Sequence, residues 1–467
     1  MSQPDIPSLA KPGLIRGLGV VAATAIVIGT VIGTGIFRKP SVIAQSVGTP
    51  GMVFLVWIVS GVLSFFGALT YAELGAAMPA AGGDYVYMKK AYGPLWGFLF
   101  GWMMFSVGRA GSIAALATGF ADYLAQFIHL GKVFISLTFH PFGLSYTFTL
   151  GTAQLSAILI IAFLTVINYF GVKMGGLVQS LFTILKVAII LLLALLGLTM
   201  SQGSWSHFQP LWPKRFEGPL YAAFGIAMID ALWAYDGWNN VNMVAGEVHK
   251  PAQNIPRALI FGTGAVMIIY LLANLAYFYV LPIETIKRSS RVAATAAEVF
   301  LGPYGASFFA VAVLLSIFAA LNGSILTGAR IYYAMSEDRL FFRRVAALHP
   351  VYRTPVFSLT LQSGLACAFT LAGNYDQLTT YVIFAEWIFY GMATAAVFVL
   401  RRKYPDWERP YRTWGYPYVP AIFVLMAAAL VINTLIYRPA ESLIGLGLIL
   451  VGLPAFYYWK RRLEKPL

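Results

Sequence analysis

The chain has 467 residues, of which 59% are hydrophobic and only 11% are charged, and its formal net charge is +14. Soluble domains have roughly 45–50% apolar and about 25% charged residues, so this composition excludes an ordinary soluble protein and indicates a bilayer as the solvent. The positive charge invites a nucleic-acid interpretation, but the apolar runs leave no soluble domain that could bind nucleic acid.

Apolar runs of about 20 residues or more, long enough to span a bilayer, recur along the whole chain. We expect twelve spans, at 18–45, 50–78, 94–127, 151–173, 175–199, 220–248, 255–281, 303–335, 355–373, 377–401, 417–438 and 442–460. Backbone groups in hydrocarbon must pair internally, and these runs are too long and continuous for barrel strands. The sequence therefore predicts an all-α polytopic membrane protein with one transmembrane domain over 1–467.

The first apolar stretch, from Leu18 to Ala44, is too long for the core of a signal peptide and has no clear small-residue cleavage site. We therefore expect it to be retained as helix 1. With a cytoplasmic N-terminus, most of the 32 Lys and Arg residues fall in inside loops, which is the positive-inside pattern. This predicts a multi-pass protein of the plasma (inner) membrane with both termini in the cytoplasm.

Two spans are interrupted by glycine and polar residues. The first contains Ile28-Gly-Thr-Val-Ile-Gly-Thr-Gly-Ile-Phe37, and the sixth contains Leu232-Trp-Ala-Tyr-Asp-Gly-Trp-Asn-Asn240. Glycine costs about 1 kcal/mol in a helix interior relative to alanine, so both clusters predict unwound segments. The alternative is close helix packing, because Gly29 and Gly33 have the spacing of a small-xxx-small contact.

The interrupted spans are the first and the sixth. Because they are five spans apart and five is odd, a five-helix unit repeated once must be inverted in the membrane. Paired interrupted helices at corresponding positions of two halves indicate a transporter binding site. The halves would be helices 1–5, at about 18–199, and helices 6–10, at about 220–401, with helices 11–12 at about 417–460.

Several motifs resemble the L-type amino acid transporter family, within the amino acid, polyamine and organocation superfamily. They are Gly33-Thr-Gly-Ile-Phe37, Gly82-Gly-Asp-Tyr85, Ala91-Tyr-Gly-Pro94, Val178-Gln-Ser-Leu-Phe-Thr-Ile-Leu-Lys186, Trp233-Ala-Tyr-Asp-Gly-Trp-Asn239, Asn254-Ile-Pro-Arg257, Asn274-Leu-Ala-Tyr277, Asn322-Gly-Ser324 and Arg409-Pro-Tyr411. The resemblance covers nearly the whole chain. It implies the five-plus-five inverted-repeat fold, with helices 1 and 6 broken at mid-membrane and helices 11 and 12 outside the repeat.

The resemblance also implies a binding site for a zwitterionic amino acid. Amides that open a half-helix attract a carboxylate, and carbonyls that end the preceding half-helix accept from an ammonium group. The substrate carboxylate would lie on the amides of Thr34 and Gly35, with Gly33 allowing close approach. The remaining substrate-binding positions implied in the two breaks are Val31, Trp233, Ala234, Tyr235, Asp236 and Gly237, and the ammonium would meet the carbonyls of Val31, Trp233 and Asp236.

Two side chains of the sixth span have alternative interpretations. Trp233 stands where the family often has phenylalanine, which implies an outer gate over the substrate, but a lipid-facing tryptophan is also common. Asp236 is a carboxylate at mid-membrane, which is costly and therefore suggests function. It would face the substrate, as in the family branch that moves cystine and dibasic amino acids, or cap the second half-helix.

Lys186 is the lysine deep in the apolar helix 5. The resemblance places it where sodium-coupled relatives hold a cation, tying helix 5 to helix 1. It would be either a fixed charge that replaces sodium or a proton carrier, and a snorkelling lysine is the structural alternative.

Further coupling or gating residues are expected on neighbouring spans. Arg109 matches an arginine that the family often has, but Ala110 follows it instead of the usual proline, so we assign it a structural or gating role. Tyr277, Asn322 and Ser324 would line the cavity near Lys186, although ordinary interhelical hydrogen bonds would also explain them.

The sequence thus predicts a sodium-independent exchanger of neutral L-amino acids by alternating access, with dibasic amino acids as further candidate substrates, or alternatively a proton-coupled symporter that uses Lys186. A membrane-embedded enzyme or a channel is disfavoured, since all five histidines fall in loops and no charged ring is visible. We expect no metal and no cofactor. The single cysteine, Cys367, lies in span 355–373, and the loop at about 128–150 has none, which excludes the disulfide-linked heavy chain of eukaryotic relatives.

Overall fold

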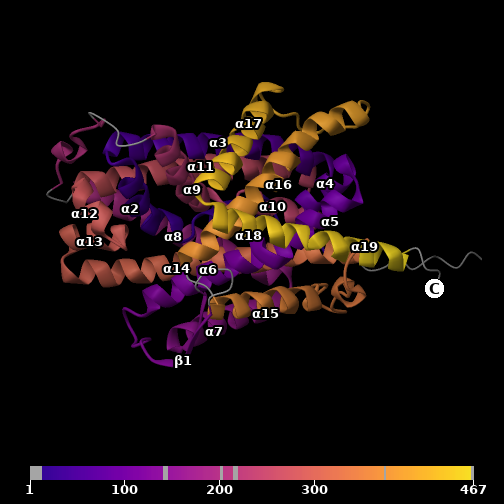
Figure 1. The fold of residues 1–467 in the computed structure, drawn as a ribbon, viewed down its shortest axis with the longest axis horizontal. Helices are drawn as coiled ribbons and strands as arrows, with labels where there is room; N and C mark the ends of the chain where they lie inside the picture. The colour runs from indigo at the N-terminus through magenta and orange to yellow at the C-terminus, as the bar shows by residue number, and fades with distance from the viewer. Residues whose placement is uncertain (1–12, 140–145, 200–202, 214–218, 373–374, 464–467) are drawn as a thin grey trace, which may run out of the picture.

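The computed structural model describes residues 13–139, 146–199, 203–213, 219–372 and 375–463. Helices dominate these ranges (Figure 1). The first half contains α1 (Val20–Val31), α2 (Gly35–Val47), α3 (Pro50–Ala77), α4 (Asp84–Tyr92), α5 (Pro94–Met103), α6 (Arg109–Leu124), α7 (Thr152–Tyr169) and α8 (Val172–Thr199). The second half contains α9 (Leu220–Tyr235), α10 (Asn240–Met243), α11 (Pro251–Val280), α12 (Ile283–Arg288), α13 (Val292–Leu301), α14 (Pro303–Glu337), α15 (Val356–Ala372), α16 (Tyr375–Lys403), α17 (Tyr418–Tyr437), α18 (Pro439–Leu450) and α19 (Gly452–Leu463).

Ten helical segments in the described part are long and apolar enough to cross a membrane. The pairs α1–α2, α5–α6 and α18–α19 each count as one of them, and α9, α13 and α15 are shorter apolar helices. The protein is therefore a multi-pass helical membrane protein, as the composition predicts.

Helix α8 has one face that packs against other helices and one face that is exposed. Its polar residues Gln179, Thr183 and Lys186 recur every three or four positions and are buried, whereas Leu177, Leu181 and Ile184 between them are exposed. Residues three or four apart share one face of a helix. The face that carries Lys186 packs on α1, α11 and α14, and the leucine face is left for the hydrocarbon.

Both glycine-rich spans are interrupted. Helix α1 ends at Val31 and α2 begins at Gly35, while α9 ends at Tyr235 and the four-residue helix α10 begins at Asn240. Helix α2 packs on α9, and α1 packs on α8 and α11.

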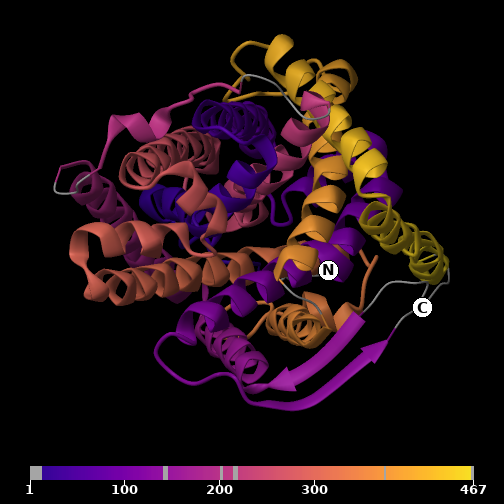
Figure 2. The same cartoon turned by 60° about the vertical axis from the view of Figure 1, so that its left-hand side comes forward.

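The all-α expectation is wrong at one point. Residues of the loop at about 128–150 form an antiparallel hairpin of β1 (Val133–Phe139) and β2 (Tyr146–Gly151). The β2 strand packs on α7 and α15, and the hairpin runs along the edge of the helical bundle (Figure 2). Alternating β-branched and aromatic residues favour a strand here.

Two further departures concern helices. The span expected at 442–460 is present as one apolar segment, Ser442–Arg462, within which α18 gives way to α19 at Val451, directly before Gly452 and close to Pro454. Span 94–127 contains a π-helical segment at Met104–Gly108 between α5 and α6.

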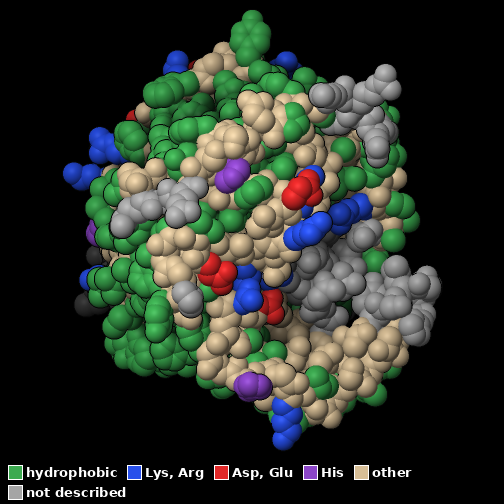
Figure 3. Space-filling view, turned by 90° about the vertical axis from the view of Figure 1, so that its left-hand side faces the viewer, with side chains coloured by type: hydrophobic (Ala, Val, Ile, Leu, Met, Phe, Trp, Pro, Cys, Tyr) green, Lys and Arg blue, Asp and Glu red, His purple; other side chains and the backbone are tan. Residues whose placement is uncertain are grey.

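The loops contain helices at both ends of the bundle. Helices α12 and α13 lie at the left end in Figure 1, and α4 and the end of α19 lie toward the opposite end. Figure 3 looks onto the left end, where charged and histidine side chains occur among uncharged and apolar surface. The helical loops leave the interrupted helices in the interior between the two ends.

Candidate functional site

The two interruptions contact each other directly. The Thr30 hydroxyl donates to the Gly237 carbonyl at 2.9 Å. A Cβ on Gly35 would lie 2.5 Å from the Cα of Ala234, so only glycine lets the start of α2 approach α9 this closely. Gly237 has a φ of +100°, a conformation that L side chains rarely adopt. Both interpretations of the glycine clusters therefore apply. Gly237 allows the chain to unwind, and Gly35 allows two helices to approach closely.

Tyr270 on α11 bridges the two breaks and was not found from the sequence. Its buried hydroxyl lies 3.0 Å from the carbonyl oxygen of Val31 and 2.7 Å from that of Ala234. The Val31 carbonyl also accepts from the amide of Gly33 at 2.8 Å. The Tyr270 phenol has one hydrogen and donates to one of the two carbonyls at a time, whereas a carbonyl has two lone pairs. When Tyr270 donates to Ala234, the Val31 carbonyl keeps a lone pair for a substrate ammonium.

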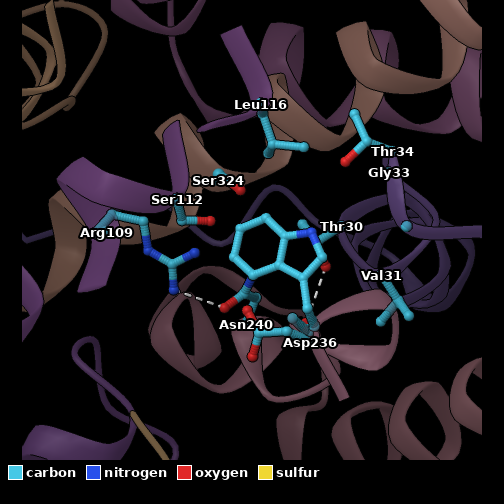
Figure 4. Close-up of a pocket in the computed structure, with 13 residues that line it drawn as sticks. Thr30, Val31, Gly33, Thr34, Arg109, Ser112, Leu116, Asp236, Asn240 and Ser324 are labelled. Atoms are coloured by element: carbon cyan, nitrogen blue, oxygen red, sulfur yellow. Dashed lines mark hydrogen bonds between the residues drawn. The ribbon is translucent and has the colours of Figure 1, made fainter. Parts of the chain in front are cut away.

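A pocket lies between the interruptions (Figure 4). It is lined by Thr30, Val31, Gly33, Thr34, Gly35, Arg109, Ser112, Leu116, Trp233, Asp236, Gly237, Asn240 and Ser324. These residues come from α1, α2, α6, α9, α14 and the segment around α10. The structure thus gathers seven expected substrate-binding residues, Val31, Gly33, Thr34, Gly35, Trp233, Asp236 and Gly237, around one cavity.

The N-terminus of α2 borders this pocket. Gly35 is the first residue of a 13-residue helix, and the first amides of a helix have no partners within it. Those amides and the helix dipole favour an anion.

Ala234 and Tyr235 do not line the pocket, contrary to expectation. The Ala234 backbone contacts Gly35 and Tyr270, and the Tyr235 ring packs against Trp57 and Tyr270. Both residues hold the end of α9 in place from behind.

Trp233 is 7% exposed and lines the pocket, so it is not the lipid-facing tryptophan of the alternative interpretation. Its burial beside both breaks is compatible with a gate.

Arg109 lies in the pocket wall, and the sequence did not assign it to the substrate site. Its guanidinium donates to the Asn240 side chain at 2.8 Å and contacts the Met243 sulfur at 3.4 Å. A Cβ on Gly328 of α14 would lie 2.4 Å from the Arg109 Cγ, so that glycine provides the space for the arginine. A π-helical segment, Met104–Gly108, ends directly before Arg109.

Asp236, which is half-buried, lies beside a carboxylate that was not singled out from the sequence. The Tyr390 hydroxyl lies 2.9 Å from Asp236 Oδ1 and 3.2 Å from Oε2 of Glu386, both tyrosine and glutamate being on α16. Asp236 does not cap α10, whose N-cap position is Asn239. The signal for Glu386 was available, because it is a carboxylate within the apolar span 377–401.

Lys186 is 1% exposed, which contradicts the snorkelling alternative. Its ammonium donates to the carbonyls of Gly29 at 2.7 Å, Ile32 at 2.5 Å and Ser316 at 3.2 Å. It therefore ties α8 to the end of α1 and to α14, without lining the pocket.

The other expected gating residues do not all lie at the pocket. Ser324 lines the pocket. Asn322 instead bonds to Asn168 at 2.9 Å and Gln179 at 2.9 Å, which is an interhelical network. Tyr277 is buried near Tyr123, and neither Tyr277 nor Asn322 is among the pocket residues.

The loop helix α4 reaches the second interruption. The Asn239 side chain donates to Asp84 Oδ2 at 3.1 Å. Burial raises the pKa of Asp84 from 3.8 to about 6. This contact couples a loop helix to the segment that carries Asp236.

Comparison with known proteins identifies the family. The model of the amino acid permease family matches residues 18–453. The chain belongs to this family. The match confirms the resemblance drawn from the motifs and excludes an assignment to an unrelated membrane-protein class.

Relatives align over nearly the full chain. The serine/threonine exchanger SteT of Bacillus subtilis is 32% identical over 453 residues, which cover 96% of this chain and 98% of SteT. The b(0,+)-type amino acid transporter 1 of Mus musculus is 30% identical, over 98% of this chain and 92% of that protein. The cystine/glutamate transporter of Homo sapiens is 30% identical, over 97% and 86%. These three relatives are named as an exchanger and two transporters.

Proposed function

We propose that this protein is an amino acid exchanger that works by alternating access and does not require sodium. The observation that carries the proposal is the pocket between two interrupted helices, with the N-terminus of α2 on one side and Asp236 on the other. Similarity to the exchanger SteT supports the exchange mode. Neutral L-amino acids are the first substrates to test.

The substrate's α-carboxylate would bind at the amides of Thr34 and Gly35. Its α-ammonium would lie near the ends of α1 and α9, at the carbonyls of Val31, Trp233 and Asp236. Trp233 would close the pocket from the outside, and Arg109 and Ser324 would complete its wall. Backbone dipoles suit a zwitterion because they carry partial charge without requiring a buried counter-ion.

Lys186 supports exchange without sodium. Three carbonyls within 3.2 Å surround its nitrogen, the kind of oxygen set that would otherwise hold a cation. An ammonium has three hydrogens and serves all three carbonyls, whereas a neutral amine has two. This favours a fixed charge over the proton carrier of the symporter alternative.

Two buried ion pairs are candidates for gates on opposite sides of the pocket. Lys39 on α2 pairs with Asp230 on α9 at 2.7 Å, and Arg330 on α14 pairs with Glu247 at 2.7 Å. Helix α2 continues toward α12, while the backbone after α10 contacts the residues before α4. Opening one pair while the other stays closed would give alternating access.

The finer architecture belongs to the same proposal. We place twelve spans in a five-plus-five inverted repeat, with α1–α2 and α9–α10 as the broken helices and the last two spans outside it. Both termini would be cytoplasmic in a plasma membrane. A disulfide-linked heavy chain is not expected, because the single cysteine, Cys367, lies in α15.

The test is counterflow in liposomes that contain the purified protein. Vesicles loaded with leucine should accumulate labelled leucine transiently, equally well in sodium and in choline. Concentrative uptake into vesicles that contain no amino acid, driven by an inward proton gradient and lost with a protonophore, would overturn exchange in favour of symport. Steep sodium dependence would overturn the role given to Lys186.

A further inference from the structure

Asp236 and Glu386 compete for a single hydrogen-bond donor. The Tyr390 hydroxyl is within hydrogen-bond distance of both carboxyl groups, at 2.9 Å and 3.2 Å. A phenol has one hydrogen, so it can donate to only one carboxyl group at a time. The other carboxyl group needs a hydrogen of its own to bond to the phenol oxygen.

Glu386 is otherwise poorly satisfied. Its side chain is fully buried, and its Oε1 has no hydrogen-bond partner among the described residues. That oxygen faces the π-helical segment that precedes α6, because a Cβ on Gly108 would lie 3.1 Å from it. A buried carboxylate without a compensating partner costs several kcal/mol.

The charges around the pair do not balance. The groups that act on it are Arg109 from α6, Tyr71 from α3, Tyr332 from α14 and Tyr390 from α16, while Asp84 from α4 acts on the two tyrosines Tyr71 and Tyr390. Helices α5 and α17 and the π-helical segment bring no Asp, Glu, Lys, Arg or His. Arg109 is thus the cation of the group, and one guanidinium neutralises only one of the two carboxylates.

Resting on the amino acid exchange proposed above, we propose that Asp236 and Glu386 together hold one exchangeable positive charge. That charge is a proton when the substrate's side chain is neutral, and the cationic side chain of a dibasic amino acid takes its place otherwise. Asp236 lines the pocket and contacts the cationic group, while Glu386 acts behind it.

The proton has a direct route into the pocket. Glu386 passes a proton to the Tyr390 oxygen, the Tyr390 hydrogen moves to Asp236, and Asp236 releases it to water in the pocket as the substrate cation arrives. No bond other than these O–H bonds changes, and the charge at the site is the same before and after.

Exchange of unlike substrates must then move protons. When external lysine replaces internal leucine, lysine enters, and leucine leaves together with one proton. The lumen becomes alkaline, and the exchange carries no net charge across the membrane. Exchange of leucine for leucine moves no net proton.

The experiment uses the full-length protein in liposomes loaded with leucine and a luminal pH dye. Labelled lysine is added outside, with and without a potassium-diffusion potential. We expect luminal alkalinisation of about one proton per lysine and no effect of the potential. Leucine exchange that rejects lysine, or lysine entry without alkalinisation, would overturn the proposal.

Glu386→Gln provides the discriminating variant. It retains the shape of the side chain but leaves a single carboxylate, which Arg109 balances. We expect leucine exchange to stay within about threefold of the wild type, lysine uptake to fall at least about tenfold, and the proton movement to disappear. An unchanged ratio of lysine to leucine uptake contradicts the proposal.

Glu337→Gln, the same change at an exposed residue of α14, is the matched control and should behave as the wild type. Tyr390→Phe removes the bridging hydroxyl and keeps both carboxyl groups, so lysine should still enter but more slowly, and a wild-type rate would contradict the relay. If Glu386→Gln does not fold, the proton measurement on the wild type and the lysine uptake of Tyr390→Phe still test the shared charge on Asp236 and Glu386. Absence of any leucine counterflow by the wild type would instead overturn the proposed function itself.

Discussion

The two interrupted helices are built differently. The break at Ile32–Thr34 carries no ionisable side chain, and it is held from outside by Lys186 on α8 and Ser316 on α14. The break after Tyr235 carries Asp236 within its own sequence and contacts Tyr390 and Asp84 through side chains. The first therefore presents mainly backbone to the pocket, and the second presents side chains.

This difference suggests a division of labour. Every amino acid has the same α-carboxylate and α-ammonium, so a backbone site suits what all substrates share. Side chains of substrates vary, so recognition of them requires side chains of the protein. Changes at the first break should therefore affect all substrates equally, and changes at the second should alter selectivity.

The largest effect is expected from Lys186→Ala. The carbonyls of Gly29 and Ile32 would lose their ammonium, and a buried group left without its partner costs roughly 1–3 kcal/mol. We expect transport of every amino acid to fall by about 100-fold or more, measured as initial counterflow rates. Lys460→Ala, at an exposed lysine of α19, is the control. If Lys186→Ala abolished transport of one substrate but not of the others, the division of labour between the two breaks would be contradicted.

Gly35→Ala tests the close approach of the two breaks. The added methyl group would meet the Ala234 backbone, and overpacking typically costs about 1–3 kcal/mol. We expect at least about tenfold slower counterflow with unchanged ratios between substrates. Gly364→Ala in α15, where a Cβ meets open space, should be harmless, and equal damage from both variants would refute the contact argument.

Trp233→Phe tests the second break through selectivity. A smaller ring enlarges the pocket, and differences of one or two methylene groups are worth about tenfold in discrimination. Uptake of bulky neutral amino acids should rise relative to alanine by about that factor. If uptake of all substrates changed by the same factor, Trp233 would not contribute to substrate selectivity.

The smallest effect concerns the link between α4 and the second break. Burial raises the pKa of Asp84 to about 6, so the folded state favours its protonated form. The stabilisation from that proton is present at low pH and is lost as the pH rises through about 6. Lowering the pH from about 7.5 to about 5.5 should stabilise the wild type by about 1 kcal/mol.

Thermal unfolding of the detergent-solubilised protein at both pH values measures this increment. The asparagine of Asp84→Asn does not titrate, so this variant should lack the part of the pH-dependent stability that comes from protonation of Asp84. Identical pH dependence in the two proteins would remove Asp84 as its source.

The sequence by itself determined the class of the protein and the location of both breaks. Long apolar runs can only be membrane helices, because their backbone groups find no water in hydrocarbon. The glycine clusters and Asp236 marked the breaks because both are costly inside an apolar helix. Lys186 was identified by the same reasoning, since an ammonium that deep must have partners.

Only the tertiary structure decided which residues meet. Glu386 and Asp236 are 150 positions apart, and Tyr270 reaches both breaks from α11. Local periodicity indicates which face of a helix is polar but not which residues that face contacts. Asn322 and Tyr277 were therefore expected at the cavity, whereas Asn322 bonds to Asn168 and Gln179 and Tyr277 is buried near Tyr123. The strands β1 and β2 were missed because a search for membrane spans treats what lies between them as loop, whereas the packing of β2 on α7 and α15 shows only in the tertiary structure.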